Sequence, residues 1–264
     1  MLTDLTHISL SSIELGVEQA GGAVLLCAVV VLFCLWYGVD VRREAALSTL
    51  RGFVQMVAVG AVLAMLLRGP LLVGALILFA MMLAAALTAS RRAKGTAGAF
   101  QTSLYAIAAG SGVVIATMIA TQALSTQVAV LVPVGSMIIA NSMNACAQAV
   151  ERLRADMTAH TGDIEAALAL GATPSAAVQR YVNSAIYASL LPRLDMLKSL
   201  GLVWIPGVMA GMMVSGADPI YAGIYQFVIV AMILAASGIT GLIATVLTRQ
   251  AAFSAADQLL LRRA

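Results

Sequence analysis

The sequence has very little charge and few polar stretches. Only 10% of its 264 residues are Asp, Glu, Lys or Arg, whereas 61% are hydrophobic and the mean hydropathy is +0.98. This composition excludes an ordinary soluble domain and is typical of a protein that lies mostly within a membrane. We therefore predict an all-α polytopic membrane protein with about seven transmembrane helices, forming a single transmembrane domain over residues 1–264.

The sequence also lacks the motifs of several enzyme and carrier classes. It has no GxxxxGK[ST] loop, so it has no phosphate cradle and no nucleotide chemistry of its own. H-E-x-x-H and G-x-S-x-G are absent as well, and we predict no catalytic residue and no enzymatic activity. The acidic residues fall at the ends of the apolar runs, which disfavours a carrier coupled to protons or sodium.

Cysteine and histidine are scarce. Cys27, Cys34 and Cys146 all fall inside apolar runs without metal-site spacing, and we interpret them as small buried hydrophobic residues. His7 and His160 are isolated from each other and lie on opposite sides of the predicted membrane. These residues predict no metal site and no cofactor bound by this chain.

The N-terminal segment lacks the basic region of a signal peptide and carries acidic residues instead. Leu10, Ile13 and Val17 are spaced along one side of a helix. Residues 1–19 are therefore predicted to form a short interfacial segment on the outer side of the membrane.

The apolar runs have the length of membrane spans. They cover about residues 20–39, 45–67, 70–90, 100–121, 127–150, 198–216 and 220–247. If the polar interval between the fifth and sixth runs lies in the cytosol, all 15 lysines and arginines except Arg68 lie on the cytosolic side. The positive-inside rule then predicts a multi-pass protein of the cell inner membrane, with the N-terminus outside and the C-terminus in the cytosol.

Residues 151–197 form the one long polar interval, and their pattern predicts folded helices. Gly162 is expected to end one helix and Asp163 to cap a short one, which Gly171 closes in a left-handed conformation. Thr173 then caps a second helix that has proline at its first position. One side of that helix, facing either the membrane or the core, carries Val178, Tyr181, Val182, Ala185, Ile186 and Ser189. This helix-turn-helix is predicted to be a cytosolic docking element.

The fifth apolar run carries a polar stripe. Met137, Asn141, Asn144 and Gln148 follow one another at helical spacing on one face. Two interpretations are open. Either the amides hydrogen-bond to neighbouring helices, each contributing about 0.6–2 kcal/mol, or the amide and thioether groups line a substrate path.

The sixth run is interrupted by Pro206 and Gly207, which should kink it and free backbone groups. Gly207 and Gly211 belong to a ridge of small residues suited to close helix contact. Met209 and Met212 are either packing residues or soft ligands that face a cavity. In the second case we expect them to face the polar stripe of the fifth run.

Arg51 and Gln55 share one face at the cytosolic end of the second run. Arg51 either extends to the lipid headgroups or pairs with an acidic residue of the polar interval. Glu165 and Asp195 are the candidates for that pair.

Two resemblances connect these features to a function. The stretch EAALALG at 165–171 resembles the EAA-x3-G signature of the cytosolic loop by which ABC-transporter permeases dock on their ATPase subunit. Further segments, taken in order, resemble the FetB-like iron-export permease family, whose plant relatives are linked to aluminium tolerance. They are RGFVQMVAVGAVL at 51–63, VPVGSMIIANSMN at 132–144, LALGAT at 168–173, LPRLDMLKSLGLVWIPGVMAG at 191–211 and GADPIYAGIYQ at 216–226.

The resemblance implies a permease subunit that dimerises and exports iron, another metal ion or a metal complex. A separate ATP-binding cassette subunit would bind ATP and Mg²⁺, giving two permeases and two ATPases in membrane lipid, with no nucleic acid involved. The implied ATPase-coupling residues are Asp163, Glu165, Ala166, Ala167 and Gly171. The chain departs from the family pattern Met-Met-Thr-Gly-Gln after Pro206–Gly207, where it has Val208-Met209-Ala210-Gly211-Met212.

Other functions are compatible with the same composition. The chain could be the permease of an ABC importer, a secondary carrier driven by an ion gradient, or a non-transporting assembly or signalling subunit. Transport in proteoliposomes without ATP would favour the carrier. A co-purified ATPase that no substrate stimulates would favour the assembly subunit.

Overall fold

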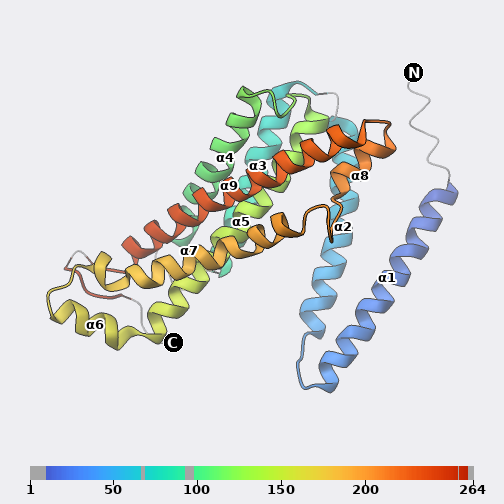
Figure 1. Ribbon diagram of the computed structural model, residues 1–264. Coiled ribbons are helices and arrows are strands. Elements are labelled where there is room, and N and C mark those ends of the chain that lie inside the picture. The colour runs from blue at the N-terminus through green and yellow to red at the C-terminus, as the bar shows by residue number, and fades with distance from the viewer. Residues whose placement is uncertain (1–9, 67–68, 93–97, 255, 261–264) are drawn as a thin grey trace. The chain divides into compact units, whose positions relative to one another are not determined.

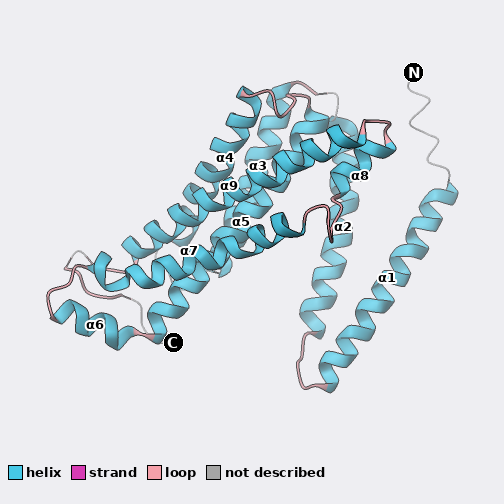
Figure 2. Cartoon of the chain, viewed as in Figure 1, coloured by secondary structure: helices cyan, strands magenta, loops and turns pink. Residues whose placement is uncertain are grey.

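The structure is a computed structural model that describes residues 10–66, 69–92, 98–254 and 256–260. These residues form nine α-helices (Figures 1 and 2). They are α1 (Leu10–Trp36), α2 (Arg42–Leu66), α3 (Leu71–Arg92), α4 (Ala99–Ala120), α5 (Val128–Ala159), α6 (Thr161–Ala169), α7 (Pro174–Ser199), α8 (Gly207–Val214) and α9 (Pro219–Ala251). The chain separates into two compact units, Met1–Leu66 with α1 and α2, and Leu67–Ala264 with α3 to α9.

Five of the described helices are long and apolar enough to cross a membrane, judged by length and composition. The candidate spans are Leu15–Trp36, Leu71–Arg92, Ala99–Ala120, Val128–Ala159 and Pro219–Ala251. A hydrocarbon core about 30 Å thick requires about 20 helical residues, and each of these helices meets that length. The predicted class, an all-α polytopic membrane protein with a helix-turn-helix element, is confirmed.

The first helix begins earlier than the predicted first span. Residues 1–9 lie outside the described part of the chain, but residues 10–19 continue without a break into the same 27-residue helix, α1. No proline interrupts this stretch, and Glu14 and Glu18 are good helix formers. No helix break therefore marks the boundary predicted near residue 20, and the interfacial placement of residues 1–19 stays a prediction. Arg68, the one cation predicted on the outer side, also lies outside the described residues.

In the second unit, α9 is the central helix, and it packs against α4, α5 and α7 (Figure 1). Its buried face carries Ile229, Ile233, Ala236, Thr240 and Ala244 at helical spacing. The crossing with α4 is close, because a Cβ added at Gly110 would lie 2.8 Å from the carbonyl oxygen of Ala236. Small residues at such crossings are expected where helices associate in lipid by packing alone.

Two tight turns connect α5, α6 and α7. α5 continues to Ala159 and α6 begins at Thr161, so Gly162 and Asp163 lie inside the first turn of α6. The prediction that they end one helix and cap the next is wrong, because the Thr161 hydroxyl donates to carbonyls in the last turn of α5 and permits an earlier turn. Gly171 closes α6 as predicted, with φ of +89°.

The bonds around Gly171 form the Schellman arrangement. The Gly171 N–H donates to the Leu168 carbonyl at 2.9 Å, and the Ala172 N–H donates to the Ala167 carbonyl at 3.0 Å. Only a residue without a Cβ adopts the required left-handed backbone at little cost. The exit from α6 is therefore fixed by its own backbone bonds.

α7 begins as predicted. The Thr173 hydroxyl accepts a hydrogen bond from the Ala176 N–H at 3.3 Å, and Pro174 occupies the first helical position. The predicted side of the helix is buried at Val178, Tyr181, Val182, Ala185 and Ser189, and half-buried at Ile186. Since α7 packs against α5 and α9, this side faces the core.

A second apolar cluster joins one end of these helices. It contains Leu153 and Met157 of α5, Ile164 of α6, Val178, Tyr181, Val182 and Ala185 of α7, and Ala252 just beyond α9. The ends of α5 and α9 therefore lie together with the start of α7, whereas α9 begins at the opposite end of the bundle. Between these two ends the chain travels along the bundle through α7, which has 26 residues and a length of about 39 Å.

The predicted sixth span, residues 198–216, is not one helix. α7 ends at Ser199, Gly201 adopts φ of +76°, and the helix resumes only at Gly207. Pro206 lacks an N–H and disfavours a helical residue before it, so the chain breaks completely instead of kinking. The following helix, α8, has 8 residues, and its length of about 12 Å is too short to cross a membrane.

Candidate functional site

One side of α6 packs on the helix bundle and the other side is exposed. Ile164 is buried in the second apolar cluster, whereas Glu165 and Ala166 are exposed and Ala167 is half-buried. Just after the helix, Leu170 has 89% of its surface exposed. The predicted coupling residues therefore share one short element whose outer surface combines a carboxylate with an apolar side chain.

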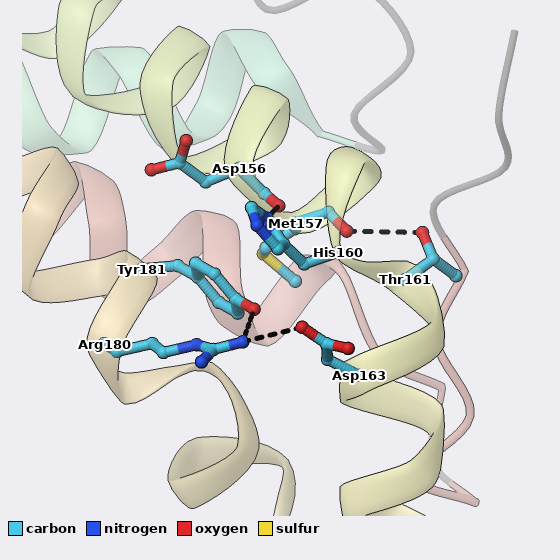
Figure 3. A network of polar contacts seen from close by, with 7 residues as sticks. All are labelled: Asp156, Met157, His160, Thr161, Asp163, Arg180 and Tyr181. Atoms are coloured by element: carbon cyan, nitrogen blue, oxygen red, sulfur yellow. Dashed lines mark hydrogen bonds and ion pairs between the residues drawn. The ribbon is translucent and has the colours of Figure 1, made fainter.

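Arg180 ties α6 to α7 (Figure 3). Its guanidinium donates to the Asp163 carboxylate at 2.9 Å and to the Tyr181 hydroxyl, and it lies 4.6 Å from the centre of the Tyr181 ring. The hydrogen bond to Tyr181 raises the pKa of Arg180 above its ordinary value, so the group is charged at neutral pH. The ion pair is exposed to solvent, so it adds little to stability, but it connects α6 directly to α7.

His160 occupies the turn between α5 and α6. Its ring stacks on Tyr181 with the ring centres 5.1 Å apart, and its Nδ1 lies 2.9 Å from the Asp156 carbonyl oxygen (Figure 3). The Asp156 side chain in turn accepts from Arg152 at 3.0 Å. Contacts on both sides of the turn therefore hold α6 firmly on the ends of α5 and α7.

The polar stripe lies on one face of α5, as its spacing predicts. Met137, Asn141, Asn144 and Gln148 are all half-buried. The Asn141 amide donates to the carbonyl of Met137, one turn earlier in the same helix, at 2.9 Å. This bond of the Asn141 side chain lies within α5 and does not join two helices.

Arg193 of α7 is the site residue that the sequence analysis missed. Only 5% of its surface is exposed. Its guanidinium donates to the Gln148 amide oxygen at 3.3 Å and to the Asn141 carbonyl oxygen at 3.1 Å. The sequence analysis treated this arginine as one of several cytosolic charges. The signal that could have revealed it is its position four residues beyond Ser189, on the buried face of α7.

α8 packs against α9. Within this contact the methyl group of Met209 lies 3.7 Å from the Cβ position of Gly223. Met212 is half-buried. The placement of Met209 and Met212 opposite the stripe therefore stays a prediction. Gly207 and Gly211 are exposed, with nothing within 4 Å of either Cβ position.

The other predicted cytosolic-end residues are separated. Arg51 and Gln55 lie on α2, in the first compact unit, and the proposed pairing of Arg51 stays a prediction. Asp195 of α7 accepts from Lys198 at 3.2 Å, and both side chains are exposed. Asp195 therefore has a partner in its own helix.

α9 adds buried polar groups that the sequence analysis did not single out. Gln226 is 1% exposed, and neither of its amide atoms has a hydrogen-bond partner among the described residues. The same is true of the hydroxyls of Ser237, Thr240 and Thr248. Polar groups buried in membrane-length helices are costly unless they find a partner.

Membrane-length helices, a helix-turn-helix at one end of the bundle and polar groups buried between the helices define a multi-pass helical membrane protein. Residues 17–253 match the uncharacterised protein family UPF0014. The chain belongs to this family.

Relatives in this family cover nearly the whole chain. A membrane protein of Bacillus subtilis (strain 168), YjkA, is 33% identical over 83% of this chain and 88% of its own length. The rice membrane protein STAR2 is 31% identical over 91% of this chain and 84% of its own. The probable iron export permease protein FetB of Escherichia coli (strain K12) is 30% identical over 92% of this chain and 94% of its own. The chain matches no solved structure.

Proposed function

We propose that the chain is the permease subunit of an ATP-driven ABC transporter that exports iron, another metal ion or a metal complex. The observation that carries the proposal is α6, an exposed helix held on the ends of α5 and α7 by Ile164 and by the ion pair of Asp163 with Arg180. The chain has no phosphate-binding loop of its own. Membership in the same family as a probable iron export permease supports this assignment.

In this proposal a separate ATP-binding subunit binds to α6. Glu165 offers a carboxylate and Leu170 an apolar side chain to that subunit. Because α6 is fixed to α7 through the second apolar cluster, a movement of α6 must also move α7. α7 runs beside α5 and carries Arg193 to the polar stripe. ATP hydrolysis at one end of the bundle is thereby connected to the stripe between the helices.

The proposal also assigns a topology and an assembly. The C-terminal half of α7 enters the membrane beside α5, and α6 remains in the cytosol with the C-terminus. The N-terminus lies outside. Two copies of the chain would join two ATPases that bind ATP and Mg²⁺. The exposed ridge at Gly207 and Gly211 is available for contact with the second copy.

Co-expression with the ATP-binding subunit tests the proposal. The double variant Glu165→Lys with Gly171→Pro reverses the exposed charge and removes the N–H that closes α6, so it should release or uncouple the ATPase. Glu44→Lys, the same charge reversal on exposed residue Glu44 of α2, is the matched control and should keep the ATPase bound. If the double variant retains full association and transport, the docking assignment is wrong.

A second arm of this experiment separates a pump from a carrier. Proteoliposomes that contain the complex should transport only when ATP is supplied on the side of α6. Transport that is driven by an ion gradient without ATP would reject the ABC assignment and favour a secondary carrier.

A further inference from the structure

Arg193 lies where a permanent positive charge is difficult to hold. Only 5% of the residue's surface is exposed. Its side chain points from α7 to α5, a helix long and apolar enough to span a membrane. Guanidinium groups stay protonated in proteins. The contact between α5 and α7 at Arg193, called the seam below, therefore contains a full positive charge.

The groups that contact Arg193 are neutral. They are the Gln148 amide oxygen at 3.3 Å and the Asn141 carbonyl oxygen at 3.1 Å. The Nε–H of Arg193 is buried and has no hydrogen-bond partner among the described residues. The nearby carboxylate of Asp195 is exposed and accepts from Lys198. Within the described part of the chain, Arg193 therefore has a spare donor and no carboxylate within ion-pair distance.

A buried cation without a counter-ion is strongly disfavoured. An oxyanion in contact with it neutralises the charge and removes most of this penalty. The guanidinium presents its donors in a planar fork that matches a carboxylate or a phosphate. Asn144 is half-buried and lies between Asn141 and Gln148 on the same face of α5, and its amide N–H₂ supplies neutral donors. The seam thus has the chemistry of an anion site.

We infer that Arg193 binds an oxyanion in the transport path, so that the substrate carries carboxylate or phosphate groups and travels as an anion or as a metal complex with anionic ligands. This inference rests on the proposed transport function and narrows its substrate class. A bare metal cation would be repelled by the fixed charge. Gln148 is a positioning residue in this arrangement, because its amide oxygen holds the guanidinium without neutralising it.

Equilibrium binding to the purified chain in nanodiscs of phosphatidylcholine tests the inference without ATP or the ATPase. The probes are radiolabelled citrate, inorganic phosphate, ferric citrate and Fe²⁺. We expect at least one of the three anionic probes to bind. Its affinity should fall about tenfold or more in Arg193→Gln, because a hydrogen bond to a charged group is lost, and less in Arg193→Lys. The inference would be overturned if none of the three anions binds, or if an anion binds wild type and Arg193→Gln with equal affinity. It would also be overturned if only Fe²⁺ binds and Arg193→Gln binds it more tightly.

A second variant keeps the test decisive if Arg193→Gln does not fold. Gln148→Glu places a carboxylate 3.3 Å from the guanidinium, where the amide oxygen now lies. It should raise the melting temperature and abolish anion binding, because the site then has its own counter-ion. Gln179→Glu adds the same charge at an exposed position of α7. It should change neither the melting temperature nor anion binding. Anion binding that survives in Gln148→Glu would refute the assignment.

Nanodiscs with phosphatidylglycerol distinguish a soluble anion from a lipid headgroup. If this lipid stabilises the wild type but not Arg193→Gln, while citrate and phosphate do not bind, the oxyanion is a headgroup and the substrate assignment is wrong. Failure of the chain to associate with an ATPase would reject the proposed function but leave the binding results unchanged. The two proposals therefore fail in different measurements.

Discussion

The crossing of α4 and α9 provides the sharpest test of the packing. A Cβ at Gly110 would lie 2.8 Å from the Ala236 carbonyl oxygen and 3.0 Å from the Thr240 backbone nitrogen, besides meeting the Thr240 hydroxyl. Two of these three atoms belong to the backbone of α9, which cannot rotate away as a side chain can. Gly110→Ala must therefore push the two helices apart or shift one along the other.

The size of the effect follows from two opposing terms. Overpacking a tight core costs about 1–3 kcal/mol, and replacing a helical glycine by alanine returns up to about 1 kcal/mol. We expect Gly110→Ala to lower the unfolding free energy by about 1–2 kcal/mol. Gly112→Ala lies two residues later in α4, with nothing within 4 Å of its Cβ position, and should be neutral or slightly stabilising.

Thermal unfolding of the purified chain in detergent measures both variants. The double variant Gly110→Ala with Thr240→Ala removes the hydroxyl from the contact and should recover part of the loss, but not all, because the backbone atoms remain. Equal melting temperatures for Gly110→Ala and Gly112→Ala would show that α4 and α9 do not approach as closely as described.

The remaining predictions concern the element around α6. Gly171→Ala forces an L residue into a φ of +89° and should destabilise the end of α6 by about 1 kcal/mol, seen as faster amide exchange over 163–173 with wild-type exchange in α9. Thr173→Ala removes the hydroxyl that caps α7 and should cost about 0.5–2 kcal/mol, measured by thermal unfolding. Ile164→Ala empties a buried position of the second apolar cluster and should weaken ATPase pull-down, whereas Ala169→Ser on exposed residue Ala169 should not.

Local signals in the sequence predicted the end of α6 and the start of α7 well. Gly171 and Thr173 act through bonds to residues within five positions of themselves, so their roles can be derived from spacing alone. The start of α6 was mispredicted because Thr161 competes with Gly162 and Asp163 for the same turn. Its hydroxyl reaches carbonyls of α5, and the sequence does not show which of three adjacent polar or small residues will do so.

The course of α7 could not be predicted from hydropathy. Its buried face contacts α5 and α9 rather than lipid, so the helix does not need the continuous apolar surface of a lipid-facing span. Arg193 was not singled out for the same reason, since a charge buried between helices looks like a loop charge in a linear sequence. The break at Pro206 was located correctly, but its severity depends on the turn at Gly201.

A reversible cross-link between α7 and α9 tests whether α7 moves during transport. A Cβ built on Gly241 of α9 lies 3.9 Å from the Ser189 Cβ of α7, within the range of about 3.5–4.5 Å that a disulfide requires. Ser189→Cys with Gly241→Cys should therefore form a disulfide on oxidation, in a background where Cys27, Cys34 and Cys146 are replaced by alanine.

The bond should lock the helix that connects α6 to Arg193. If ATP hydrolysis moves the substrate site through α7, oxidation should stop transport while the ATPase stays bound, and a reductant should restore transport. The two single-cysteine variants should transport equally with and without oxidant. Unchanged transport in the fully cross-linked protein would show that α7 and α9 move as one body. The link from the coupling element to the substrate path would then have to run through α5, whose end also holds α6 in the second apolar cluster.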